Sequence, residues 1–200
     1  MKKLLIITAF LFVLPMTAQK EKAILHFKDG SKITGLAKII TSGARIKFRK
    51  DKKSKYKVYT PDDVESIEIY EKESFSTTVY SHYYFKKTKK NTLPRLLKLM
   101  EDGKANLYLD YNEYNKVFVI GSNGISPAVN PSISHYYVSR AGDEFVTRLG
   151  GQGSLFKKNF KKGASEYFKD CPELVKKIEN KEFKRRDIEE VVNFYNRECE

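Results

Sequence analysis

Residues 23–40 read AILHFKDGSKITGLAKII, two β-type runs on either side of an Asp-Gly pair. Asp-Gly between two such runs is a strong signal for a tight β-hairpin, because glycine accepts the positive φ that the turn requires. Gly35 lies inside the second run, where a missing side chain lets a strand bend or bulge. This stretch therefore predicts two antiparallel strands, at 23–27 and 32–40.

The next two runs, RIKFR at 45–49 and KYKVY at 55–59, alternate polar and apolar residues. Alternation is typical of a half-buried strand. The segment TPDDV that follows predicts a single capped helical turn, with Thr60 as N-cap and Pro61 at the first helical position. A last strand, SIEIY at 66–70, completes a small β unit.

Bent strands followed by a short helical turn and a final strand resemble an Sm-like small β-barrel. The likeness rests on Lys28-Asp29-Gly30-Ser31, Ile33-Thr34-Gly35 and Pro61-Asp62-Asp63-Val64. The chain also resembles uncharacterised secreted proteins of Bacteroidota bacteria, in Arg45-Ile46-Lys47-Phe48-Arg49, Tyr59-Thr60-Pro61-Asp62-Asp63-Val64, Tyr167-Phe168-Lys169-Asp170-Cys171-Pro172 and Phe194-Tyr195-Asn196. These resemblances imply a small barrel over residues 20–72, an envelope or extracellular setting and no catalytic residues.

The β-type pattern continues over residues 73–150, which we expect to form a second antiparallel unit. Asp102-Gly103 predicts one hairpin, and the turn around Gly142 predicts another. After residue 150 the spacing of the apolar residues changes from the alternation of a strand to a repeat of four. The repeat is carried by Phe156, Phe160, Ala164 and Phe168. That spacing predicts a helix with one apolar face, which either lies on a membrane or, as we favour, packs on the sheet.

Two more helices, one opening at Pro172 and one over 185–198, should form a helical hairpin within the C-terminal segment 151–200. The predicted fold class is therefore α+β. Its β-rich N-terminal two-thirds, a small barrel plus further antiparallel strands, is followed by a C-terminal helical segment.

The two cysteines flank this helical hairpin, Cys171 just before its first helix and Cys199 just after its second. Antiparallel packing brings both thiols to the same end. In an oxidising compartment we expect a Cys171–Cys199 disulfide, with two unpaired thiols as the alternative. The bond contributes roughly 3 to 4 kcal/mol on the loop-entropy model.

The first 18 residues have the order of a cleavable secretory signal. Lys2 and Lys3 precede the uncharged run Leu4 to Ala18, which ends in a small residue before the polar Gln19. We expect cleavage between Ala18 and Gln19, and an exported protein, periplasmic or secreted. The run of 15 residues is short of the roughly 20 that cross a bilayer, and no transmembrane segment is expected in the mature chain.

Net charge points toward anionic partners. Of the 38 Lys and Arg, 36 remain without Lys2 and Lys3, and against 25 Asp and Glu they give a net charge of +11. Possible contacts with an anionic partner gather at two predicted hairpin tips: Lys50, Lys52, Lys53, Lys55 and Lys57 at one, Lys86, Lys87, Lys89 and Lys90 at the other. The expected partner is an envelope protein, a glycan or an anionic membrane surface, and export disfavours nucleic acid. A lysine-rich solvated surface is the structural alternative.

No catalytic or cofactor motif stands out. His26, His82 and His135 have no second histidine or carboxylate at ligand spacing in the sequence, so we expect no metal site and no cofactor. We therefore predict a non-catalytic binding or interaction module of the cell envelope. The alternative is a hydrolase acting on an envelope polymer, because carboxylates that meet only in space leave no spacing signal.

Overall fold

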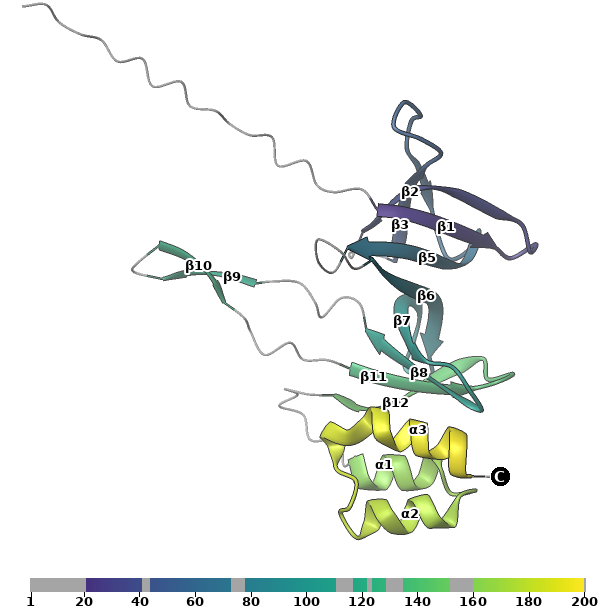
Figure 1. The fold of residues 1–200 in the computed structure, drawn as a ribbon, viewed down its shortest axis with the longest axis vertical. Coiled ribbons are helices and arrows are strands. Elements are labelled where there is room, and N and C mark those ends of the chain that lie inside the picture. The colour runs from purple at the N-terminus through teal and green to yellow at the C-terminus, as the bar shows by residue number, and fades with distance from the viewer. Residues whose placement is uncertain are drawn as a thin grey trace, which may run out of the picture.

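The structure is a computed structural model that describes residues 21–40, 44–72, 78–110, 117–121, 124–128, 135–151 and 160–199. Its strands are β1 (Glu21–Phe27), β2 (Lys32–Ile40), β3 (Arg45–Arg49), β4 (Lys57–Tyr59), β5 (Val64–Lys72), β6 (Thr78–Thr88), β7 (Asn91–Glu101), β8 (Ala105–Asp110), β9 (Val117–Gly121), β10 (Gly124–Ala128), β11 (His135–Arg140) and β12 (Phe145–Gly151). The helices are α1 (Phe160–Tyr167), α2 (Pro172–Glu179), the 3-10 helix η2 (Arg185–Asp187) and α3 (Ile188–Glu198). The fold is α+β and mostly strand, with the helices at its C-terminal end, as predicted (Figure 1).

Ten strands form one sheet in the order β12-β11-β8-β7-β6-β5-β1-β2-β3-β4. A short parallel ladder, Phe145 with Lys87 and Val146 with Thr88, joins β12 back to β6. Strands β6, β7, β8, β11 and β12 therefore close into a five-stranded barrel. Strands β1 to β5, where the small barrel was expected, continue the same sheet beyond β6, because β5 pairs with β6 along its length.

The three predicted hairpins are confirmed. β1 pairs with β2, β7 with β8 and β11 with β12, all antiparallel. At the first turn Gly30 has φ of +82°, and Asp29 Oδ1 accepts hydrogen bonds from Ser31 N at 2.9 Å and Ser31 Oγ at 2.6 Å. The turn at Thr60 also forms, since Val64 N donates to Thr60 O at 3.1 Å.

Gly35 serves a close approach between β2 and β3. A Cβ at this position would lie 2.3 Å from Arg49 O and 2.5 Å from the Phe48 ring. Only glycine allows the two strands to pack at this distance.

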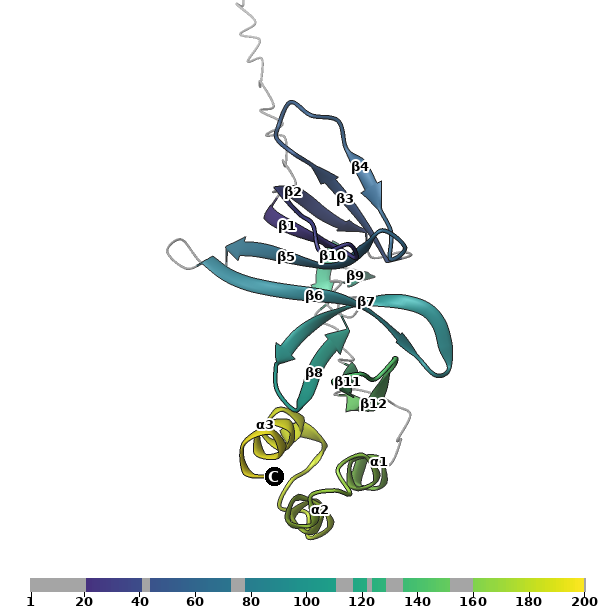
Figure 2. The same ribbon diagram turned by 90° about the vertical axis from the view of Figure 1, so that its right-hand side faces the viewer.

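The buried apolar residues form three layers, and Figure 2 shows the order of the elements that enclose them, from β1 to β5 through the barrel to the helices. The first is enclosed by β1 to β7 and contains Leu25, Ile46, Ile67 and Tyr83 among its buried residues. The second fills the barrel, with Leu97, Tyr108, Tyr137 and Val146. The third lies between the outer face of the barrel and the helices, with Leu107, Val138, Phe168, Leu174 and Val192. Strand β6 is the shared wall, because Tyr83 faces the first layer while Tyr84 packs against the second.

The helices are docked on the sheet mainly through α3. Asn196 pairs with the backbone of Ala105, accepting from its N at 2.8 Å and donating to its O at 3.0 Å. Tyr136 OH donates to Glu189 Oε1 at 2.8 Å, and α1 buries Phe160 and Ala164. The apolar face predicted for this first helix thus packs on the sheet, while Phe156 lies outside the described residues.

Candidate functional site

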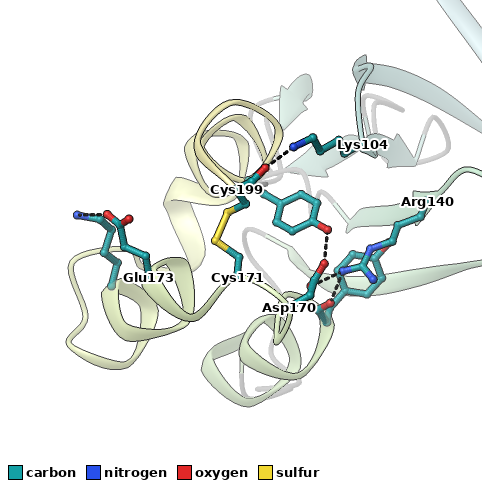
Figure 3. The surroundings of a disulfide bond; sticks show 9 residues. Lys104, Arg140, Asp170, Cys171, Glu173 and Cys199 are labelled. Atoms are coloured by element: carbon teal, nitrogen blue, oxygen red, sulfur yellow. Dashed lines mark hydrogen bonds and ion pairs between the residues drawn. A yellow bond between two sulfur atoms is a disulfide. The ribbon is translucent and has the colours of Figure 1, made fainter.

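The predicted disulfide is present. Cys171, the N-cap of α2, and Cys199, the C-cap of α3, are bonded, with their Cα atoms 5.7 Å apart (Figure 3). Both cysteines are buried, and the Lys104 ammonium donates to the Cys199 carbonyl. The bond therefore ties the two helices together at the place where β8 begins.

Polar contacts beside the disulfide link α1 to the sheet (Figure 3). The Arg140 guanidinium donates to Asp170 Oδ1 at 2.6 Å and to Tyr167 O at 2.9 Å, and Tyr195 OH donates to Asp170 Oδ2 at 2.5 Å. Burial raises the pKa of Asp170, but the hydrogen bonds from Tyr195 and Arg140 outweigh it, so the net pKa lies below its usual value. This cluster holds the helices in place.

The first lysine group lies on the loop between β3 and β4 and on the first residue of β4, together called here the lysine loop (residues 50–57). Its five lysines, Lys50, Lys52, Lys53, Lys55 and Lys57, are all exposed. Tyr56 in the same loop is 39% exposed, and Val58 just beyond it 43%. In Figures 1 and 2 the loop lies at the end of the molecule opposite the helices.

Hydrogen bonds order the lysine loop. Asp51 Oδ1 accepts from Lys53 N and Ser54 N, both at 2.8 Å, and these bonds, with the Ser54 hydroxyl as the largest cause, lower the Asp51 pKa. Arg49 donates to Lys52 O at 2.8 Å and lies over the Tyr56 ring, 4.9 Å from its centroid.

The second lysine group is divided. Lys87, Lys89 and Lys90 at the turn from β6 to β7 are exposed, but Lys86 is half-buried with its ammonium 5.6 Å from the ring centroids of both Tyr84 and Tyr108. This turn extends from the side of the molecule in Figure 2, away from the lysine loop. The structure thus presents two separate basic tips.

A cluster that the sequence analysis missed brings two histidines and a glutamate together on three neighbouring strands. In the strand register Glu68 of β5 lies opposite His82 of β6, and Ser66 of β5 lies opposite both His26 of β1 and Tyr84 of β6. All of these residues point away from the first apolar layer, because the alternate residues Leu25, Ile67 and Tyr83 fill that layer. We call His26, Glu68 and His82 the His/Glu cluster.

Close contacts connect the His/Glu cluster. His26 Nε2 lies 2.6 Å from Glu68 Oε1, and one ligand atom from each of the three residues lies within 4.8 Å of the others. His82 Nε2 is 3.0 Å from Ser66 Oγ and His82 Nδ1 is 3.1 Å from Tyr84 OH. Burial lowers the pKa of His82 and raises the pKa of Tyr84 to about 12.

His26 and His82 have no partner at ligand spacing in the sequence, yet the fold brings them together with Glu68. Their positions are far apart in sequence, and only the pairing of β1, β5 and β6 unites them. The sequence held only a weak indication of this cluster: in its strand, each histidine alternates with the apolar residues and so belongs to the face opposite the first apolar layer. Knowing which face a residue belongs to does not show which strands are neighbours in the sheet.

The third histidine belongs to a polar group inside the barrel. Arg95 donates to Asp110 Oδ2 at 2.5 Å and to Tyr137 OH at 3.0 Å, and Arg148 contacts the His135 ring. Asp110 is only 1% exposed, so its pairing with Arg95 is needed to offset the loss of water. Burial, together with the Arg148 charge, lowers the pKa of His135 to about 4.

Among the described residues no helix combines the length and apolar character needed to cross a membrane. The segment 1–18 and the expected cleavage site between Ala18 and Gln19 lie outside the described residues. Comparison of the chain with protein-family models, with curated proteins and with solved structures gives no match.

Proposed function

We propose that this protein is an exported, non-catalytic binding module of the cell envelope that holds an anionic partner through its lysine loop. The observation that carries the proposal is the loop itself, where five exposed lysines and the exposed Tyr56 lie on one short hydrogen-bonded segment. Clustered cations attract anionic partners and accelerate their association. An exposed aromatic ring beside them adds contact area with little loss of conformational freedom.

The fixed conformation of the lysine loop supports this proposal. Asp51 and Arg49 fix the backbone at Lys52, Lys53 and Ser54 through hydrogen bonds of 2.8 Å. A loop already held in shape gives up less conformational entropy on binding, so more of the electrostatic attraction becomes affinity.

Export is supported by the disulfide and by the signal-like order of the first 18 residues. Disulfides persist in oxidising compartments and are rare in the cytosol. Such a setting makes acidic glycans and anionic lipid surfaces the expected partners, and it disfavours nucleic acid.

The alternative of a hydrolase has less support among the described residues. A groove of about 430 Å³ beside α3 is lined by several glutamates, as an acid–base site requires. However, Glu189 accepts from Tyr136 OH, and Glu101 Oε1 accepts from Asn193 at 3.2 Å. These carboxylates hold α3 on the sheet, which favours a structural role for them.

A pair of charge-matched variants tests the proposal. In Lys52→Gln/Lys53→Gln/Lys55→Gln three charges leave the lysine loop, and in Lys87→Gln/Lys89→Gln/Lys90→Gln three leave the other tip. Binding to vesicles containing anionic lipid and to an acidic polysaccharide is measured by cosedimentation at low and high salt. We expect salt-sensitive binding of the wild type to one probe, a loss of that binding in the first variant and retention in the second.

Equal losses in the two variants would show that overall charge, and not the lysine loop, drives binding. Wild-type binding that does not change with salt would also contradict the proposal, because exposed charges are screened within about 10 Å at 0.1 M salt.

A further inference from the structure

The His/Glu cluster has a geometry that its role in the sheet does not require. Polar residues on the outer face of a sheet ordinarily point separately into water. Here the side chains of His26, Glu68 and His82 converge from three strands, and their ligand atoms lie within 4.8 Å of one another. The side chains of His26 and Glu68 are only 15% and 13% exposed.

One buried nitrogen in the cluster lacks a hydrogen bond. His26 Nε2 lies 2.6 Å from Glu68 Oε1, yet it has no hydrogen-bond partner among the described residues. The two atoms are thus close without hydrogen-bond geometry. An imidazole nitrogen and a carboxylate oxygen side by side are two of the ligand types that bind zinc.

His82 is oriented by its neighbours. Its Nε2 lies 3.0 Å from the hydroxyl of Ser66, the direct cross-strand neighbour of His26, and zinc bound at Nε2 would replace this hydrogen bond. Its Nδ1 lies 3.1 Å from the Tyr84 hydroxyl on the same strand. Histidines that bind metals almost always use the second ring nitrogen in such a hydrogen bond, which fixes the ring.

We propose that His26, Glu68 and His82 form a divalent zinc site, with Nε2 of both histidines and a carboxylate oxygen of Glu68 as ligands and Tyr84 orienting His82. Two imidazoles and one carboxylate form a ligand set that suits zinc, and they leave a coordination position for water or a further ligand. Calcium and magnesium prefer sites made of oxygen ligands and are not expected to bind. The inference is independent of the lysine loop and of the anionic partner.

Isothermal titration calorimetry of zinc binding to the untagged protein tests the site. We expect one equivalent of Zn²⁺ to bind with a micromolar or lower Kd, and Co²⁺ to give the visible absorption of a four-coordinate site. Glu68→Gln and His82→Gln should each weaken zinc binding by more than the ~10–100-fold that loss of an orienting neighbour costs. Tyr84→Phe should weaken it within that range.

Matched controls come from the same chain. Glu144→Gln alters an exposed carboxylate away from the cluster, and His135→Gln removes a histidine inside the barrel. Neither should change the zinc affinity. Circular dichroism establishes that each variant is folded, and added zinc should raise the melting temperature of the wild type but not of Glu68→Gln.

No zinc binding by the folded wild type would overturn the proposal. So would binding that survives unchanged in Glu68→Gln and His82→Gln, since the zinc would then lie elsewhere. In either case the three residues would form only an ion pair beside a hydrogen-bonded histidine.

Discussion

The two ends of the molecule use their side chains differently. At the helical end, polar groups are committed to holding elements together: Asn196 binds the backbone of Ala105, Asp170 joins Arg140 to Tyr195, and the cysteines are bonded. At the other end, the strands are held by one apolar layer, the lysine loop is exposed, and the His/Glu cluster lies half-buried on the opposite side of the sheet from that layer.

From this contrast we infer that the helical end stabilises the fold and that the other end binds partners. The helical end serves as a scaffold, in which a change removes stability. The exposed lysines contribute little to packing, and the His/Glu cluster lies outside the first apolar layer, so changes there should alter binding and leave the fold intact. Changes at the two ends should therefore differ in their effect on stability, and the largest losses are expected at the helical end.

Phe168→Ala should be the most damaging single change. Phe168 is fully buried in the layer under the helices, and its ring centroid lies 4.8 Å from that of Tyr195. Removing a buried phenylalanine costs ~3–5 kcal/mol of unfolding free energy, through lost burial and the cavity left behind. Urea unfolding measures the loss. Leu93→Ala, at a position 72% exposed, is the control and should cost less than ~0.5 kcal/mol.

The disulfide should rank second. Cys171→Ala/Cys199→Ala opens a loop with a sequence separation of 28 and should lower the unfolding free energy by ~3–4 kcal/mol. The same urea titration applies, with the wild type under reducing conditions as a second comparison. Stability that does not change would mean that the helices are held by their other contacts, and the scaffold role of the bond would be wrong.

Two glycines give opposite expectations. At Gly35 a Cβ would meet Arg49 O at 2.3 Å, so Gly35→Ala should force β2 and β3 apart and cost ~1–3 kcal/mol. At Gly163 in α1 a Cβ meets nothing within 4 Å, so Gly163→Ala should stabilise the protein by ~0.5–1 kcal/mol. Melting temperatures that shift in the same direction would contradict the packing described here.

A further prediction is a pH dependence from His135. Its pKa of about 4 in the folded protein compares with ~6.5 in an unfolded chain. The unfolded chain therefore binds a proton first as the pH falls, and the stability linked to the neutral ring is lost between pH 6.5 and pH 4. NMR titration of the histidine rings should show His135 neutral at pH 5. A midpoint near 6.5 would mean that the ring is not enclosed by the barrel.

Local signals predicted much of this fold. Asp29-Gly30 and Asp102-Gly103 marked hairpins correctly because the backbone of such turns depends on the turn residues themselves. The disulfide was predictable from the helices that flank it. The last helix, expected over 185–198, has its first turn as the 3-10 helix η2 and the rest as α3.

Features that depend on distant strands were not predictable. The ladder that closes the barrel pairs Phe145 with Lys87, and no local pattern marks that meeting. The His/Glu cluster likewise depends on the register of β1, β5 and β6, in which His26 and His82 flank one strand. The lysine loop was predicted as a charged tip, but the half-buried place of Lys86 over two tyrosines was not.

Mapping the bound surface by NMR tests the division between the two ends most directly. Amide shifts are recorded while the anionic probe that binds in cosedimentation is titrated into the labelled protein. We predict that shifts concentrate at residues 50–57 and the adjoining parts of β3 and β4, and that α1, α2 and α3 do not respond. Shifts concentrated on the helices, with the lysine loop unchanged, would contradict the account.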